Sequence, residues 1–154
     1  MSTIKIQTVT AMLAACGVFA MPAAHAASAN PAGVIKTSKG SVTIEREGRK
    51  MAGPVGATVL PSDRIVTGVD GSAGITLRDE TLLALGPNTT LALDKFAFDS
   101  TTHAGALDAS VKRGTLAVIS GKLAKQSPGA VKFTTPSTVL GVRGTEFVIE
   151  VGEQ

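Results

Sequence analysis

Residues 131–151, VKFTTPSTVLGVRGTEFVIEV, decide the fold of this chain. The end of the stretch alternates, and the side chains that would share one face are Thr145, Phe147, Ile149 and Val151. The side chains that would point the other way are Glu146, Val148 and Glu150. This alternation predicts a β-strand with one buried face. Pro136 lacks a backbone N–H, so we expect a bend or a strand start at Thr135 and Pro136.

Arg143 is the unusual residue of this stretch, because it lies between Gly141 and Gly144 among small and apolar neighbours. One interpretation is a contact with a ligand or a partner. The other is a half-buried arginine that is paired inside the domain, and the apolar surroundings favour it. The candidate carboxylate partners are Asp63, Asp79 and Glu146. The flanking glycines would allow close backbone approach or a positive φ.

The composition predicts an all-β fold. The chain has 17 glycines and 7 prolines among its 154 residues. Short apolar or alternating runs recur about every eight to twelve residues, which is typical of a sandwich, barrel or roll. We expect one domain of many short strands, at 33–37, 41–46, 64–67, 73–77, 81–85, 89–93, 107–111 and 116–119. A turn is expected at 112–115 and exposed loops at 99–105 and 120–129.

The first 26 residues have the pattern of an export signal peptide. Lys5 precedes an uncharged apolar core, and the small residues Ala24 and Ala26 form a cleavage site. Residues 27–32 then form a flexible lead-in, and residues 33–154 form the β domain. This pattern predicts a protein of the periplasm, or one exported beyond it.

Cys16 allows a different processing of the same segment. Residues 13–16, LAAC, resemble the bacterial lipobox, in which Cys16 would be lipidated and would anchor the chain to a membrane. Membrane association is therefore expected only if Cys16 is lipidated or the signal is retained. The continuous apolar run through Phe19 to Met21 favours plain secretion. The mature chain would contain no cysteine, and so no internal disulfide.

The sequence shows no constellation of catalytic, cofactor-binding or metal-binding residues. His103 is the only histidine after the signal, in a polar segment with Asp99 and Ser100 that is typical of a solvated loop. One histidine without cysteine is a weak basis for zinc. The net charge is only +3 and there is no Trp or Tyr, so nucleic-acid binding is not expected. We therefore expect a non-enzymatic protein without a cofactor.

Several segments, in order, resemble the FecR domain family, which occurs in the periplasmic part of bacterial iron-uptake regulators. The matching segments are 33–34, 40–42, 59–68 (VLPSDRIVTG), 72–79 (SAGITLRD), 85–89 (LGPNT), 113–116 (RGTL), 134–137 (TTPS) and 142–148 (VRGTEFV). The last two are the most specific. The residues that this motif marks as structural or partner contacts are Thr135, Pro136, Gly141, Arg143, Gly144 and Thr145.

The resemblance implies an all-β, non-enzymatic domain. In the iron-uptake regulators the family relays a signal from an outer-membrane transporter to a cytoplasmic sigma factor. Here we expect a stand-alone exported domain, without the sigma-binding and transporter-contacting domains. The first hypothesis is a binding or sensing module that recognises another envelope protein or a cell-wall component. The alternative is a self-associating structural β domain, in which edge strands such as Leu116–Ile119 pair between copies.

Overall fold

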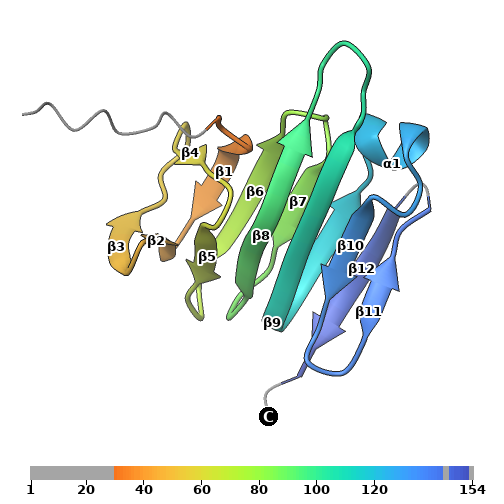
Figure 1. The fold of residues 1–154 in the computed structure, drawn as a ribbon. Helices are drawn as coiled ribbons and strands as arrows, with labels where there is room; N and C mark the ends of the chain where they lie inside the picture. Colours follow the sequence, from red (N-terminus) through yellow and green to blue (C-terminus); the bar gives the residue numbers. More distant parts are fainter. Residues whose placement is uncertain (1–29, 144–145, 153–154) are drawn as a thin grey trace, which may run out of the picture.

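The computed structural model describes residues 30–143 and 146–152. The predicted signal peptide and Cys16 lie outside the described residues, as do Gly144 and Thr145 of the family motif. The described chain folds into twelve strands and one short helix (Figure 1). This confirms the predicted all-β fold of many short strands.

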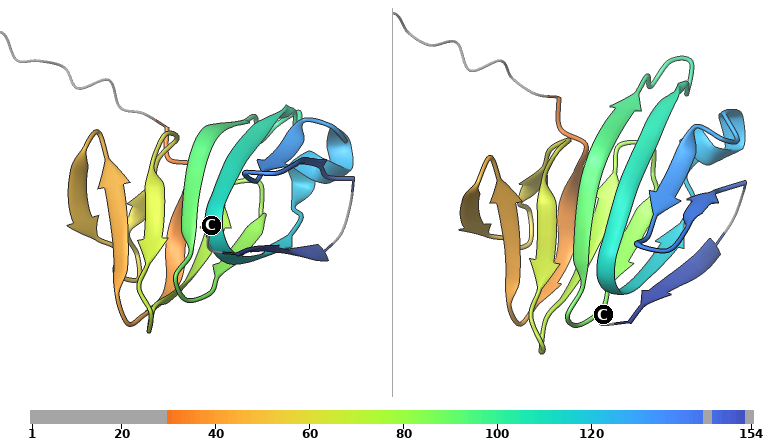
Figure 2. Two further views of the ribbon diagram at one scale, coloured as in Figure 1. Left: turned by 90° about the horizontal axis from the view of Figure 1, so that it is seen from below. Right: turned by 60° about the horizontal axis from the view of Figure 1, so that its bottom comes forward.

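The strands form two curled sheets that share one long strand, β9 (Gly105–Ile119) (Figure 2). Sheet A has the order β4 (Thr58–Val59), β1 (Gly33–Lys39), β6 (Ser72–Leu77), β7 (Leu82–Leu85), β9 and β12 (Glu146–Val151). Sheet B has the order β3 (Arg49–Ala52), β2 (Val42–Arg46), β5 (Arg64–Thr67), β8 (Thr90–Phe98), β9, β10 (Val131–Thr134) and β11 (Val139–Gly141). Neighbouring strands are antiparallel except β9 and β10, which are parallel.

The predicted turn at 112–115 is wrong, because β9 continues through it from sheet B into sheet A. Residues up to Arg113 pair with β8, and residues from Gly114 onward pair with β12. Gly114 has φ 88° at this crossing, and a Cβ atom there would lie 2.5 Å from the Cα of Thr89. Only glycine fits this conformation and this space. The strand therefore bends instead of reversing, and it joins the two sheets.

The core lies between the two sheets and draws aliphatic side chains from both. Ile35 and Val118 come from sheet A, and Ile65 and Leu107 come from sheet B. In β12 the predicted alternation is confirmed: Ile149 is buried, while Phe147 and Val151 are half-buried and pack against the core. The residues of β12 that point outward are Glu146, Val148 and Glu150.

Two buried carboxylates hold turns of the domain. Asp63 is paired with Arg46, whose Nε and Nη2 donate hydrogen bonds of 2.7 and 2.6 Å to its two carboxylate oxygens. Asp63 also accepts a 2.8 Å bond from the backbone N–H of Leu60. Asp79 accepts bonds from the backbone N–H and the hydroxyl of Thr81. These two groups are two of the three predicted partners of Arg143, the third being Glu146, and each of the two has a different partner.

The structure also differs from two further predictions, the loop at 120–129 and the edge strand Leu116–Ile119. The predicted loop 120–129 contains a short helix, α1 (Lys122–Gln126), whose Leu123 and Ala124 are buried. Leu116–Ile119 is not an edge strand, because it pairs with β7 on one side and β12 on the other. The prediction that this segment pairs between copies is therefore wrong. The open edges of the described sheets belong to β3, β4, β11 and β12.

Candidate functional site

The clearest exposed feature is the free edge of β12. Among the described strands, β12 pairs only with β9. Thr115 of β9 directs its carbonyl away from β12, where it accepts a 2.9 Å bond from the N–H of Gly86. Its β12 neighbour Glu150 therefore belongs to a non-bonded pair and directs its own N–H and C=O away from β9. By the same alternation, Val148 and Glu146 also present backbone groups to the free edge.

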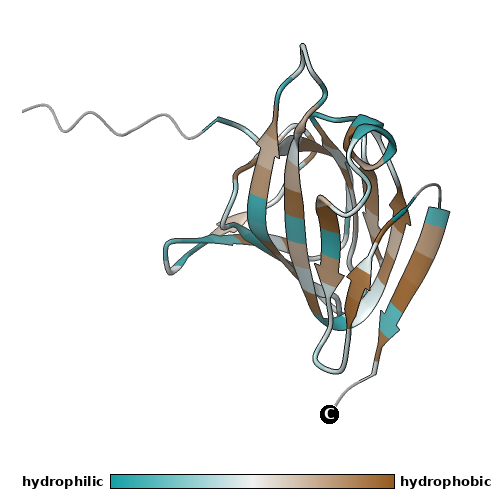
Figure 3. Ribbon diagram, turned by 45° about the vertical axis from the view of Figure 1, so that its right-hand side comes forward, coloured by the Kyte–Doolittle hydropathy of each residue, from teal (hydrophilic) through white to brown (hydrophobic). Residues whose placement is uncertain are grey.

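A groove of about 400 Å³ lies beside this edge. One wall is the loop between β10 and β11 together with Leu140 of β11, and the other wall is the second half of β12. The loop residues of the groove are Thr135, Pro136, Ser137 and Thr138. Figure 3 shows β12 at the outside of the domain, with hydrophobic positions between hydrophilic ones. The groove thus joins an open strand edge to a wall of hydroxyl and apolar groups.

The loop wall is held in one shape by its own hydrogen bonds. The hydroxyl of Thr135 accepts a 3.1 Å bond from the backbone N–H of Thr138. It also lies 3.2 Å from the carbonyl oxygen of Thr138, to which it donates. Pro136 limits the backbone between them. The predicted bend at Thr135 and Pro136 is confirmed, because β10 ends at Thr134 and the chain reverses into β11.

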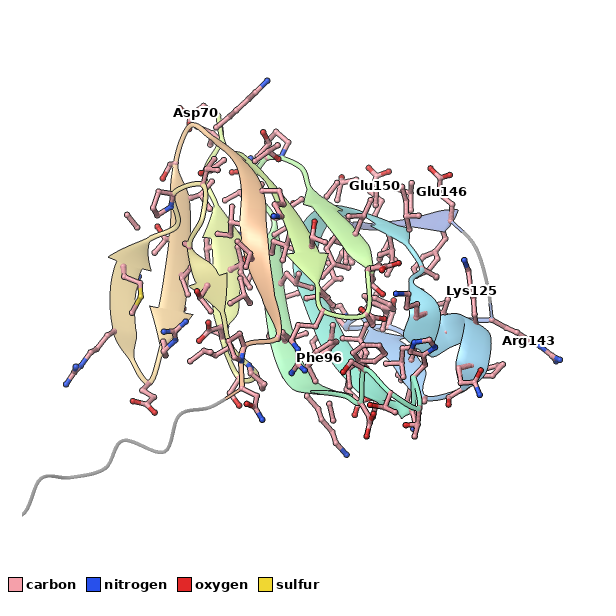
Figure 4. The ribbon with its side chains drawn as sticks, turned by 90° about the horizontal axis from the view of Figure 1, so that it is seen from above. Asp70, Phe96, Lys125, Arg143, Glu146 and Glu150 are labelled. Atoms are coloured by element: carbon pink, nitrogen blue, oxygen red, sulfur yellow. The ribbon has the colours of Figure 1, made fainter. Side chains whose placement is uncertain are left out.

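Arg143 is exposed, so the expected half-buried, internally paired arginine is wrong. Its neighbour Val142 is buried and donates its N–H to Val131, which leaves the next side chain pointing outward. Figure 4 shows Arg143 projecting away from the body of the domain. Gly141 has no positive φ, and a Cβ atom there would meet nothing within 4 Å. The predicted close approach at this glycine is therefore also wrong.

The family-motif residues thus separate into two ends of one surface. Thr135 and Pro136 form the loop wall of the groove, near the end of β12. Arg143 lies before the start of β12. Glu146 and Glu150 project from β12 on the same side in Figure 4 and carry negative charge along the strand. Sequence reasoning identified the motif but missed the groove, because the groove depends on β11 and β12 leaving their facing edges open.

The loop that carries His103 is held by a ring stack and by two hydrogen bonds to Asp99. The His103 ring stacks on Phe98 with centroids 6.0 Å apart. Asp99 accepts hydrogen bonds from the backbone N–H groups of Thr101 and Thr102. These bonds lower the pKa of Asp99 below its ordinary value, and the bond from Thr102 has the largest effect. The predicted exposed loop at 99–105 is confirmed as far as Ala104, and β9 begins at Gly105.

Over residues 30–143 and 146–152, no three His, Cys, Asp or Glu side chains gather as a metal site would require. No helix in these same ranges has the length and apolar character needed to cross a membrane.

The fold and the groove define a small all-β domain with two curled sheets and one open strand edge beside a fixed loop. The model of the FecR protein family matches residues 63–154, and the chain belongs to this family. The match begins at the buried carboxylate Asp63 and includes the whole groove. Family membership indicates a sensing or regulatory domain of the periplasm, in a family that interacts with other envelope proteins in signalling. The comparisons with curated proteins and with solved structures find no match.

Proposed function

We propose that this chain is a non-enzymatic, exported binding module of the cell envelope that recognises another envelope protein along β12. The observation that carries the proposal is the free edge of β12 beside the groove. An extended segment of a partner can pair with such an edge as an additional strand, and the groove then selects its side chains. Membership of a family of envelope signalling domains supports this role.

The chemistry of the surface favours a polypeptide as the partner. A row of backbone N–H and C=O groups is complemented by the same groups of another strand, which a glycan of the cell wall does not carry. Glu146 and Glu150 favour basic side chains on the incoming segment. Arg143, at the other end of β12, would pair with an acidic group of the partner. A partner strand would therefore run from the groove toward Arg143.

The arrangement of His103 supports a non-enzymatic role. Its ring packs against Phe98, and the nearby carboxylate of Asp99 is engaged by the turn that it stabilises. A general base needs a free, oriented nitrogen within reach of a nucleophile. The two buried carboxylates of the described residues, Asp63 and Asp79, are bonded to Arg46, Leu60 and Thr81. They act in turns of the fold.

The proposal can be tested by photo-crosslinking in the cell that exports the protein. A photo-reactive amino acid replaces Thr138 in the groove, or Lys50, an exposed residue of β3 far from the groove in sheet B. We expect a discrete product with a second envelope protein from position 138 and not from position 50. The substitution Glu150→Pro removes an outward N–H and should abolish that product, because proline cannot donate to an added strand.

Glu150→Ala is the matched control, since it removes the carboxylate but keeps the N–H. It should retain most of the product. Both variants should have the thermal midpoint of the parent, because the N–H of Glu150 is not bonded to β9. Identical products from both crosslinking positions would contradict the proposal, as would a product that survives in Glu150→Pro. A product containing only peptidoglycan would assign the groove to the cell wall.

A further inference from the structure

The outer face of sheet A carries an apolar strip that the fold does not need. Two rows of side chains, in register across β6, β7 and β9, form this strip: Thr76, Leu82 and Ile119 in one row, and Gly74, Ala84 and Ala117 in the next. Leu82 is 42% exposed and Ile119 is 45% exposed, while Leu83, the next residue of β7, points inward and is 2% exposed. The inward residue fills the core, so the two outward ones contribute little to it.

The rows enclose a shallow depression of about 290 Å³. Glycine and two alanines form its floor, and Leu82 and Ile119 form a ridge beside it. An exposed hollow with this apolar lining is a typical feature of a surface that contacts another macromolecule. It lies on a face of the sheet, whereas the β12 edge runs along its border, so the two surfaces differ and have Glu146 in common.

Opposite charges stand at the two ends of the strip. Lys36 lies on β1, at the bulge between the residues paired with Ile75 and Gly74. Glu146 lies on β12, in the row of Ile119 and Leu82. Both side chains are exposed and both line the depression. No ion pair joins either of them to another residue within the described ranges. The face is therefore positive at one end and negative at the other. The two charged residues, Lys36 and Glu146, lie at nearly the same position along the strand direction.

We infer that the outer face of sheet A binds a second copy of this chain, about a two-fold axis that runs along β7. β7 is the middle strand of the five from β1 to β12. Rotation about an axis along it turns the face over and exchanges the two ends. Lys36 of each copy then lies opposite Glu146 of the other, and Leu82 meets Leu82. An axis across the strands would instead place Lys36 beside Lys36, so the charges select the first arrangement.

The size of the face predicts a weak dimer. Five strands about 4.8 Å apart and about six residues long give a face of roughly 24 by 20 Å. Two such faces bury roughly 1,000 Å² in total, the lower limit for a specific interface. A dimer of this size should have a dissociation constant in the micromolar range or above, and its association should weaken with added salt, which screens exposed ion pairs.

The test is sedimentation velocity of the exported chain over a concentration series, with charge-reversed variants. The parent should show a concentration-dependent dimer. Lys36→Glu and Glu146→Lys each place like charges opposite each other twice, so each should raise the dissociation constant by about tenfold. A mixture of the two variants restores both pairs between unlike copies, and should dimerise at least as strongly as the parent. The double variant should do so as well.

Two controls keep the result specific. Lys50→Glu reverses a charge on β3 of sheet B, away from the strip, and should leave the dissociation constant unchanged. Leu140→Ala alters the groove beside β12 and should also leave it unchanged, which separates this inference from the proposed function. A parent that stays monomeric at about 1 mM overturns the inference. Dimerisation of each single variant equal to the parent, or no recovery in the mixture, overturns the two-fold arrangement.

Discussion

Two arginines of this domain lie in opposite environments. Arg46 is the last residue of β2, beside a charged turn, yet its guanidinium holds the buried Asp63 through two hydrogen bonds and also donates one to the carbonyl of Thr58. Arg143 has glycines and apolar residues around it in the sequence, yet its side chain is exposed. The hydrogen bond with Asp63 raises the pKa of Arg46, against the opposing effect of burial.

The contrast teaches that neighbours in sequence do not decide whether an arginine is buried. Arg46 is 28% exposed because the turn at Asp63, 17 residues away, folds back beside it. Arg143 follows Val142, whose side chain is buried in the core, and the arginine side chain is exposed. The first arginine stabilises the fold, and the second is available to a partner. The predictions below test this division.

The largest effect is expected from Arg46→Ala. It leaves the carboxylate of Asp63 buried without its cation, and breaking such a pair costs about 3 kcal/mol of unfolding free energy. Urea unfolding of the parent and the variant measures this difference. A loss below about 1 kcal/mol would mean that the Arg46 pair does not hold the turn at Asp63.

Asp63→Asn should have a smaller effect of the same sign. The amide keeps the shape and can still accept the N–H of Leu60, but it loses the charge that faces Arg46. We expect a loss of about 1–2 kcal/mol, because charge-assisted hydrogen bonds are stronger than neutral ones. The double variant with Arg46→Ala should lose less than the sum of the two single losses, and an additive result would show that the two residues act separately.

Arg143→Ala should change the unfolding free energy by less than about 0.5 kcal/mol, as is usual for an exposed side chain. The same urea titration measures it beside the Arg46 variant. A loss of about 1–3 kcal/mol would instead be the signature of a buried, paired guanidinium, and it would restore the interpretation that the sequence first favoured.

The smallest effect is local and depends on pH. The pKa of Asp99 is lowered by the backbone N–H groups of Thr102 and Thr101, so its charged form stabilises the loop. This stabilisation is present above the ordinary value of 3.8 and is lost as the pH falls through the lower value in the folded protein. Amide proton shifts of Thr101 and Thr102, followed by NMR, should therefore titrate below pH 3.8. A midpoint above that value would show that the two bonds do not form.

Much of the fold could be predicted from local patterns. Alternation predicted the buried face that contains Ile149, and short apolar or alternating runs predicted strands such as those at 64–67 and 73–77. The continuity of β9 could not be predicted, because Gly114 has the residue type of a turn and its φ of 88° serves a bend between sheets. The pair of Arg46 with Asp63 and the groove beside β12 arise from segments far apart in the chain. No short window of sequence contains that information.

The family motif itself was recognised from residues 134–148, while the favoured interpretation of Arg143, a half-buried arginine paired inside the domain, is wrong because the side chain is exposed. Small and apolar residues around Arg143 resemble a buried site in sequence. In the structure Gly141 ends β11, Val142 is buried and β12 begins at Glu146; β11 and β12 have free edges that border a groove. We propose that the motif contacts a partner along β12.

The most direct test of this account measures the yield of the Thr138 crosslink in exporting cells that carry Arg143→Ala. The account predicts that the variant is as stable as the parent while its crosslink yield falls about fivefold or more, as expected for loss of an arginine that contributes about 1 kcal/mol or more to binding. An unchanged yield from an equally stable variant would contradict the claim that this segment binds a partner.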